Sequence, residues 1–488
     1  MSARRQTPVN SLSIGLVEDA NSHTVAGYPA RVSTRAGDVL VLHVATTARR
    51  FRADFHRAGH QAPPMASVVW AGERAEPRRY DEDWQWPRFD FSVPSDWPSG
   101  VYIVVLTPEP GARPPTVEHL GGPALDARTA RLLVLVTPSG PRNADVLYKV
   151  PILTYHAYNL SGGGSLYGPD GDPQGTAQGG GIARVNLRRP GGGVGGPVKG
   201  MPDAHDLATP RQTFAHWDAP FIAWLESNGI ACDFCTDLDL HEGRHLDDGY
   251  RLLLSAGHDE YWTDEIRRNT ETFRDAGGNI ANFGANTCWW RIRIAEDDAT
   301  VCCEKYPPLS TGGDPDGLRY APDKWWETEP ENSLTGVSYR NGGGHWSGIR
   351  APIGYTVQHT DHWAFAGTGM ADGDVLGAEH AIVGYECDGA RFDRDPTGRA
   401  RPTGSDGTPT DFTILGIAEL PQGASQGWEF SARDDSYPPR AATFGLYTRG
   451  GTVFTAATTD WSRALMHDRR VATVTRNVIT RLSRDQRN

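Results

Sequence analysis

The sequence predicts a multi-domain protein in which a small all-β sandwich precedes a three-layer α/β domain. Its 488 residues leave room for roughly two to four domains. Residues 11 to 137 read as short runs rich in β-branched and aromatic residues, bounded by Gly, Pro, Asp or Ser. From about residue 145 strands alternate with helices, the pattern of an α/β domain. We expect residues 1–140 to form the sandwich and 141–488 the α/β domain, because Thr137–Arg142 has linker composition.

The β domain is predicted from strands whose spacing suits a sandwich. A turn at Trp97–Gly100 leads into one of them. The expected strands are Val39–Val44, Phe51–Phe55, Val68–Trp70, Val101–Leu106 and Leu132–Val136.

The α/β domain begins with an apolar strand at Val146–Leu153. A helix at 219–228 is expected to have Asp218 as its N-cap, and a second helix should be capped by Thr263. Strands at Tyr250–Ala256 and Asn279–Phe283 flank this second helix and complete a β-α-β unit. The sequence therefore predicts a parallel sheet covered by helices.

Composition and charge exclude several classes of partner. The formal net charge is −12, so no overall positive field collects phosphate groups, and a nucleic-acid partner is not expected. No stretch approaches 18 consecutive apolar residues. We interpret the protein as cytoplasmic and not associated with a membrane.

Three loops are expected where ligands bind in open α/β sheets, beyond the carboxyl ends of the strands. They are Thr154–Asn159, Gly257–Trp262 and Gly284–Arg291. His258, Asp259 and Glu260 could act as a general base, as metal ligands, or as both. In the simpler interpretation the carboxylates satisfy first-turn helix amides and His258 bonds a backbone carbonyl. The Tyr, Trp, His and Asn residues gathered in all three loops favour a ligand site.

Several motifs in this order resemble those of a known family. They are Thr154–Asn159, Gly164–Tyr167, Gly257–Trp262, Gly284–Asn286, Trp290–Arg291, Asp361–Trp363, Gly367–Gly369, Gly384–Glu386, Thr459–Trp461 and Thr475–Val478. Together they resemble the large subunit of N,N-dimethylformamidase and its relatives over about residues 145 to 482. The resemblance implies an Ig-like sandwich followed by a glutamine-amidotransferase-like α/β domain.

The resemblance also implies a mononuclear non-haem iron held by two tyrosines and a glutamate. Matched by motif, these ligands are Tyr158, Tyr167 and Glu260, with Tyr155 as the alternative to Tyr158. We prefer Tyr158 because it directly precedes Asn159. Phenolate and carboxylate oxygens are hard donors suited to ferric iron.

The function implied is hydrolysis of a small amide C–N bond by metal-activated water. His258 would carry the proton, Glu260 would hold the metal, and Asn286 would bind the substrate or the ligand carboxylate. The resemblance adds a small partner subunit, and assembly as a homo-oligomer is compatible with it. Two alternatives stay open: a relative with the same iron site and another substrate, and a non-catalytic binding module in which Glu260 caps a helix.

Overall fold

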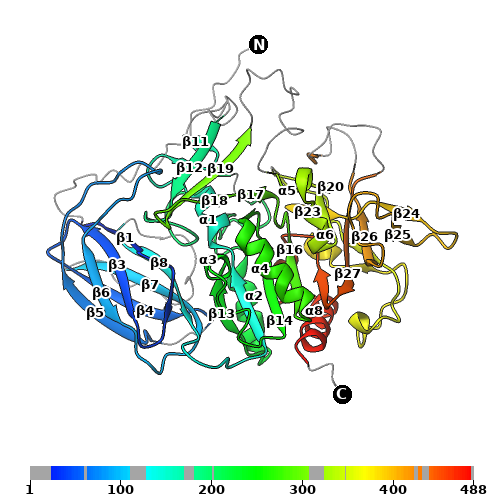
Figure 1. Cartoon of the computed structure of the whole chain (residues 1–488), viewed down its shortest axis with the longest axis horizontal. Helices are drawn as coiled ribbons and strands as arrows, with labels where there is room; N and C mark the ends of the chain where they lie inside the picture. Colours follow the sequence, from blue (N-terminus) through cyan, green and yellow to red (C-terminus); the bar gives the residue numbers. More distant parts are fainter. Residues whose placement is uncertain are drawn as a thin grey trace, which may run out of the picture.

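The computed structural model describes residues 23–59, 63–109, 128–169, 181–200, 203–306, 324–346, 348–421, 427–430 and 439–484. Figure 1 shows the blue N-terminal strands on one side and the green-to-red part of the chain on the other. The protein is a mixed α/β structure that contains more strand than helix.

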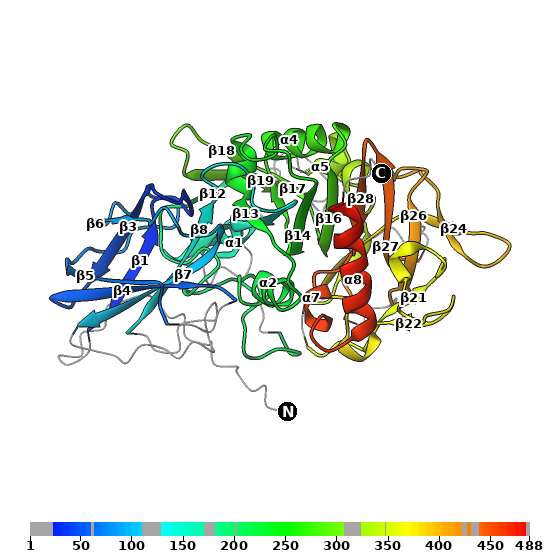
Figure 2. The same ribbon diagram turned by 90° about the horizontal axis from the view of Figure 1, so that it is seen from below.

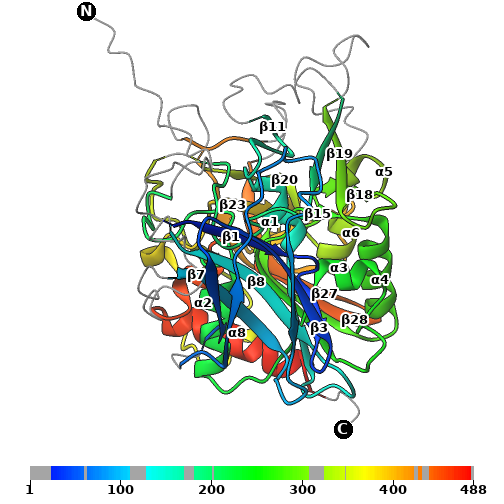
Figure 3. The ribbon, with the colours of Figure 1, turned by 90° about the vertical axis from the view of Figure 1, so that its left-hand side faces the viewer.

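The N-terminal part contains two β-sheets (Figures 1 and 3). The first has the strand order β1 (Val25–Pro29), β3 (Val39–Thr46), β6 (Arg88–Ser92). The second has the order β2 (Ser33–Arg35), β8 (Ala130–Thr137), β7 (Gly100–Glu109), β4 (Arg50–Arg57), β5 (Ala66–Ala71). All five expected strands are present, whereas β1, β2 and β6 were not predicted.

Strands β7 and β8 are apolar on both faces, and the structure gives the reason. Because successive strand residues face opposite sides, Tyr102 and Val104 pack inside the N-terminal part. Val101 and Ile103 pack into the large core that continues through the α/β part. The two parts of the chain therefore share an apolar boundary.

The centre of the molecule is a nine-stranded sheet. Its order is β13 (Asp233–Thr236), β9 (Val146–Val150), β14 (Leu252–His258), β16 (Asn279–Ala285), β28 (Gly451–Thr455), β27 (Ala441–Arg449), β26 (Thr413–Glu419), β21 (Tyr355–Val357), β22 (Val375–Leu376). The first five strands are parallel, as the β-α-β pattern predicted. The other four pair antiparallel, so the prediction of a parallel sheet is wrong for that half. Hairpin-connected strands there need no helical crossover.

Helices lie on both faces of this sheet (Figure 2). One face carries α2 (Asp218–Ser227), α7 (Trp461–Ala464) and α8 (Arg469–Leu482), and α4 (Asp264–Asp275) lies on the other with α3 (Asp237–His241) beside it. Thr263 caps α4 as predicted, its side chain accepting a bond from the Ile266 amide. Among the described helices none has the length and apolarity needed to cross a membrane.

Two local predictions are wrong. The expected end of the first strand and the loop after it form helix α1, Ile152–Tyr158. Pro151 ends the strand because it has no amide hydrogen, and every residue of α1 is buried, so no amphipathic pattern indicated a helix. Asp218 does not cap α2: it is the first helical residue, and Trp217 holds the N-cap position without a side-chain bond.

Short elements complete the described structure. They are β10 (Gly164–Ser165), β11 (Gly168–Pro169), β12 (Gly181–Asn186), β15 (Tyr261–Trp262), β17 (Trp290–Arg291), β18 (Arg293–Ile294), β19 (Thr300–Tyr306), β20 (Ser338–Gly344), β23 (Glu386–Gly389), β24 (Phe392–Arg394), β25 (Ala400–Pro402), α5 (Trp325–Thr328), α6 (Asn332–Thr335), η4 (Trp363–Phe365) and η5 (Ala378–His380).

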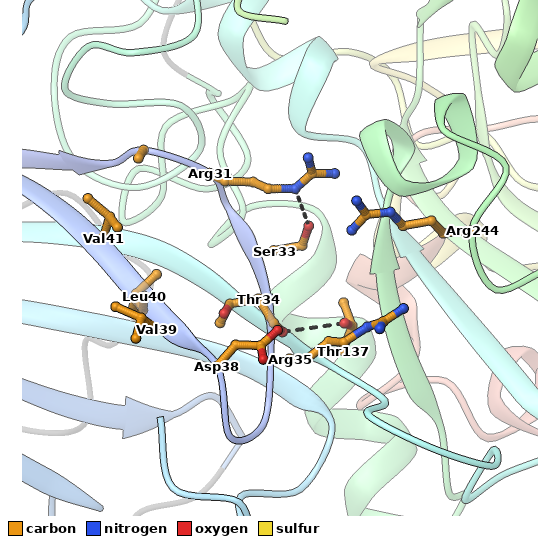
Figure 4. A pocket seen from close by; sticks show the side chains of 11 residues that line it. Arg31, Ser33, Thr34, Arg35, Asp38, Val39, Leu40, Val41, Thr137 and Arg244 are labelled. Atoms are coloured by element: carbon orange, nitrogen blue, oxygen red, sulfur yellow. Dashed lines mark hydrogen bonds between the residues drawn. The ribbon is translucent and has the colours of Figure 1, made fainter. Parts of the chain in front are cut away.

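A cavity of about 430 Å³ lies where the N-terminal part meets α3. Figure 4 shows Arg31 and Arg244 reaching toward one another across it. Both guanidinium groups pair with Glu242, at 2.6 Å and 2.8 Å. Ion pairs therefore connect the two parts of the chain beside this cavity.

Candidate functional site

The predicted site residues meet at the carboxyl ends of the parallel strands. His258 ends β14, and Asn286 directly follows β16. The two strands pair in parallel with His258 opposite Ala285, so both side chains start from the same edge of the sheet. Tyr158 reaches this edge as the last residue of α1, which follows the adjacent strand β9. The fold thus brings together residues that are far apart in sequence.

The three predicted metal ligands converge through their side-chain oxygens. The Tyr158 hydroxyl lies 2.7 Å from the Tyr167 hydroxyl and donates to Glu260 Oε2 at 2.7 Å. Tyr261, which was not predicted, donates to the Tyr167 hydroxyl at 2.9 Å. Lys305 bonds the Tyr261 hydroxyl and lies over the Tyr167 ring, 3.2 Å from its centroid.

Tyr155 points elsewhere. Its hydroxyl donates to Asp218 Oδ2, while Tyr148 donates to Oδ1 of the same carboxylate at 2.8 Å. Of the two tyrosines left open by the sequence, Tyr158 is therefore the one beside Tyr167 and Glu260.

The oxygen cluster suits a hard cation. Burial raises the pKa of Tyr158 well above its usual value, and the charge of Glu260 raises it further. Burial also raises the pKa of Glu260 and lowers that of Lys305 to about 8. A cation would reverse this cost, because it favours the deprotonated oxygens. Among the described residues, His, Cys, Asp and Glu alone form no group of three that could hold a metal. Any metal bound here would therefore need the tyrosine oxygens as ligands.

His258 forms a buried ion pair next to the cluster. Its Nε2 lies 2.8 Å from Glu386 Oε2 and 3.5 Å from Glu260 Oε2. Burial alone would lower the pKa of His258, but the charge of Glu386 and its hydrogen bond raise it above the ordinary value. For Glu386 the charge of His258 outweighs burial and lowers the pKa. Each group of the pair therefore favours the charged form of the other.

Asn286 is bonded to this pair and not to the carboxylate of Glu260. Its Nδ2 donates to Glu386 Oε2 at 3.1 Å and lies 3.3 Å from His258 Nε2. Its Oδ1 is buried without a hydrogen-bond partner. Asn286 therefore does not bond Glu260, which was one of its two predicted partners. Its Oδ1 could accept a hydrogen bond from a bound molecule.

The orientation of His258 is fixed from its other side. Nδ1 donates to Gln212 Oε1 at 2.8 Å, and Gln212 Nε2 donates to the Tyr385 hydroxyl at 2.9 Å. The ring nitrogen that faces Glu386 is thereby Nε2.

The loop that carries Glu260 is supported from below. The Thr154 hydroxyl accepts a bond from the Glu260 amide at 2.9 Å. Lys149 and Asp259 form a fully buried ion pair, and Asp259 accepts from the Trp262 indole at 2.9 Å. Because Thr263 caps α4 and the Glu260 side chain bonds Tyr158, the alternative in which Glu260 caps a helix is wrong.

Sequence reasoning did not assign Glu386, Lys305, Tyr261 or Gln212 to the site. One signal was present: the chain has only four lysines. All four lie over aromatic rings of this region: Lys149 over Trp262, Lys199 and Lys305 over Tyr167, and Lys324 over Trp289 and Trp290. In a chain that otherwise uses arginine, the position of its lysines would have indicated the site.

Comparison with known proteins gives the same family. A family model described as "N,N-dimethylformamidase beta subunit-like, C-terminal" matches residues 49–473. The N,N-dimethylformamidase beta subunit of Paracoccus aminophilus is 23% identical over 484 residues, which cover 87% of this chain and 57% of that protein. The beta subunit from Alcaligenes sp is 25% identical over 236 residues, or 44% of this chain and 29% of its own. The chain therefore spans little more than half the length of the relative that it matches most fully.

Proposed function

This chain belongs to the N,N-dimethylformamidase beta subunit-like family, and we propose that it is an iron-dependent hydrolase of small amides. The observation that carries the proposal is the convergence of Tyr158, Tyr167 and Glu260 beside the His258–Glu386 pair. The family supports a hydrolase, and the site supplies the groups that amide hydrolysis requires.

Tyr158, Tyr167 and Glu260 would hold a ferric ion through three anionic oxygens. When bound, the ion would polarise the amide carbonyl and lower the pKa of water. Lys305, buried against the Tyr167 ring, favours negative charge on these oxygens.

His258 and Glu386 move the protons. Cleavage of an amide requires a base that takes a proton from water and an acid that protonates the leaving nitrogen. The Glu386 carboxylate can take the proton from water, and the His258 imidazolium, whose Nε2 lies 2.8 Å from that carboxylate, can deliver a proton to the leaving amine. Gln212 keeps the imidazole in place during this exchange.

Asn286 orients the substrate. Its amide nitrogen is used by Glu386, and its free Oδ1 can accept a bond from a substrate N–H. Trp262 donates to Asp259, and Lys149 lies over its ring. Trp289 and Trp290 are buried beside Lys324.

A partner subunit is part of the proposal. The relatives are named as beta subunits, and this chain matches only part of their length. Activity should therefore be measured with this chain alone and again with any small chain that co-purifies with it.

Metal analysis and a visible spectrum test the proposal directly. Protein expressed with iron should hold about one iron per chain and show a tyrosinate-to-iron absorption band, which Glu260→Gln should remove. Tyr155→Phe is the matched control and should keep both. Formamides, acetamides and larger N-substituted amides then test the reaction. Bound iron without turnover would favour the same site with another substrate, and colourless metal-free protein would favour a binding module.

A further inference from the structure

Trp346 is the exposed member of a closed set of contacts around the proposed acid–base pair. Its indole Nε1 donates to Glu386 Oε1 at 2.9 Å, and its backbone oxygen accepts from Arg211 at 3.0 Å. The Arg211 guanidinium lies over the Tyr385 ring, 4.2 Å from the centroid. Tyr385 bonds Gln212, which holds His258 and so leads back to Glu386.

The backbone brings this indole onto Glu386. Gly344, near the end of β20, pairs with Glu386 at the start of β23, and Trp346 follows two residues later. A Cβ added to Gly344 would lie 2.5 Å from the Trp346 indole nitrogen, so only glycine permits this approach. The indole therefore packs against Gly344 of β20, the residue that pairs with Glu386.

Trp346 also lies where the site meets solvent. Its side chain is 36% exposed, whereas Glu386, His258 and Glu260 are buried. Both carboxylate oxygens of Glu386 have partners. His258 and Asn286 bond Oε2, and the indole bonds Oε1. Of the side chains bonded to this carboxylate, His258 and Asn286 are buried, whereas the indole reaches solvent.

From this geometry we propose that Trp346 determines which N-substituted amides the site accepts as substrates. The inference rests on the proposed amide hydrolysis. The leaving nitrogen must lie near the His258–Glu386 pair to be protonated, and the partly exposed indole is bonded to Glu386 of that pair. Alkyl groups on the nitrogen pack against the indole face, and the acyl group lies toward Tyr158 and Glu260. Trp346 thus selects small N-alkyl groups and has no influence on the acyl group.

Two substrate series test this assignment in the iron-loaded protein. One keeps the formyl group and enlarges the N-alkyl groups from methyl to ethyl and propyl; the other keeps N,N-dimethyl and enlarges the acyl group. Trp346→Ala should raise kcat/KM for N,N-diethyl relative to N,N-dimethyl by about 10-fold or more, the scale of a methylene in an apolar pocket. The acyl series should change by less than about 2-fold. Trp346→Phe keeps a ring and should retain the size preference.

A second measurement does not depend on turnover. Tryptophan labelled with ¹⁵N gives one indole signal that Trp346→Phe removes, and this signal should shift when iron-free protein is titrated with N,N-dialkylacetamides. Acetamide itself should leave it unchanged. Trp70→Phe, in strand β5 of the N-terminal part, is the control variant and should alter neither selectivity nor the response.

The outcomes separate the two proposals. If no amide is hydrolysed but the Trp346 signal responds to N-alkyl groups, the proposed reaction fails and the binding role stands. If amides are hydrolysed and Trp346→Ala leaves the N-alkyl preference unchanged, the role of Trp346 is overturned. A signal that responds only to the acyl group also overturns it.

Discussion

Two groups of two tyrosines and one carboxylate lie close together in this protein, and helix α1 supplies one tyrosine to each. In the site group, Tyr158 contacts both Tyr167 and Glu260. In the core group, Tyr148 and Tyr155 each donate to their own oxygen of Asp218. The residue types are nearly the same, but the bonding differs.

The hydroxyls of the core group bond only within the group, whereas the site group also contacts charged residues outside it. Both phenol hydrogens of the core group are bonded, and Phe221 and Phe234 pack around Tyr148. The Glu260 carboxylate instead lies 3.5 Å from His258, and the Tyr167 ring faces Lys305. Residue composition alone therefore does not distinguish the two groups; the side chains in direct contact with each group do.

The largest expected contrast is loss of the metal from the site group. Glu260→Gln should abolish iron binding and reduce amide turnover by roughly 10⁴-fold, because the Lewis acid contributes several kcal/mol to the reaction. Asp218→Asn replaces the matching carboxyl of the core group and should keep the iron. Iron content and the visible spectrum of both variants, after a check of folding by circular dichroism, decide this. Equal iron loss in both would erase the distinction.

Titration of the core group should make the stability of the fold depend on pH. Burial raises the pKa of Asp218 from 3.8 to about 7, although the two tyrosine bonds act in the opposite direction. The folded protein thus binds a proton that the unfolded chain releases between these values. Stability contributed by this proton is full below about pH 4 and is lost as pH rises toward 7. The difference corresponds to roughly 4 kcal/mol.

Urea unfolding at several pH values measures this contribution. The wild type should lose stability between pH 4 and 7 relative to Asp218→Asn, in which residue 218 no longer titrates. Curves that run parallel for the two proteins would contradict the assignment.

The site group should respond to pH through His258. Although burial lowers its pKa, Glu386 raises it above the ordinary value of about 6.5. The stability contributed by the His258 proton is therefore full below that value, as long as Glu386 stays ionised, and is lost as pH rises through the raised pKa. Glu386→Gln should lower the pKa of His258 below 6.5, because burial then dominates.

Histidine signals in the NMR spectrum of the iron-free protein report this titration. His156, whose pKa burial and Arg189 lower to about 3, serves as an internal reference that stays neutral. Asp218→Asn should leave His258 unchanged. A wild-type His258 that titrates below 6.5 would show that the pair is not charged.

The sequence predicted several residues of the site but not the residues that bond to them. Strand-following loops placed His258, Glu260 and Asn286 at one edge, because parallel strands end together. Glu386 belongs to the family motif Gly384–Glu386 but was not assigned to the site, because it reaches the site through the antiparallel pairing of β20 and β23, which the sequence does not indicate. Asp218 was mistaken for a cap, since a carboxylate at a helix start also fits that role in sequence.

Helix α1 was missed for a related reason. Its residues are buried all round and include aromatic and β-branched side chains, so the pattern resembled a strand and a loop. That error left Tyr155 and Tyr158 equivalent in sequence. Only their placement on one helix, with hydroxyls bonded to different carboxylates, separated them.

The smallest expected effect completes the comparison on that helix. Tyr155→Phe removes one hydrogen bond to Asp218 and should cost about 1 kcal/mol in the free energy of unfolding, because the ring stays packed. Iron content should not change. Tyr158→Phe, three residues later, should cost a similar amount of stability and lose the iron. Urea unfolding with iron analysis on both variants makes the test, and loss of iron from Tyr155→Phe alone would transfer the ligand role to Tyr155.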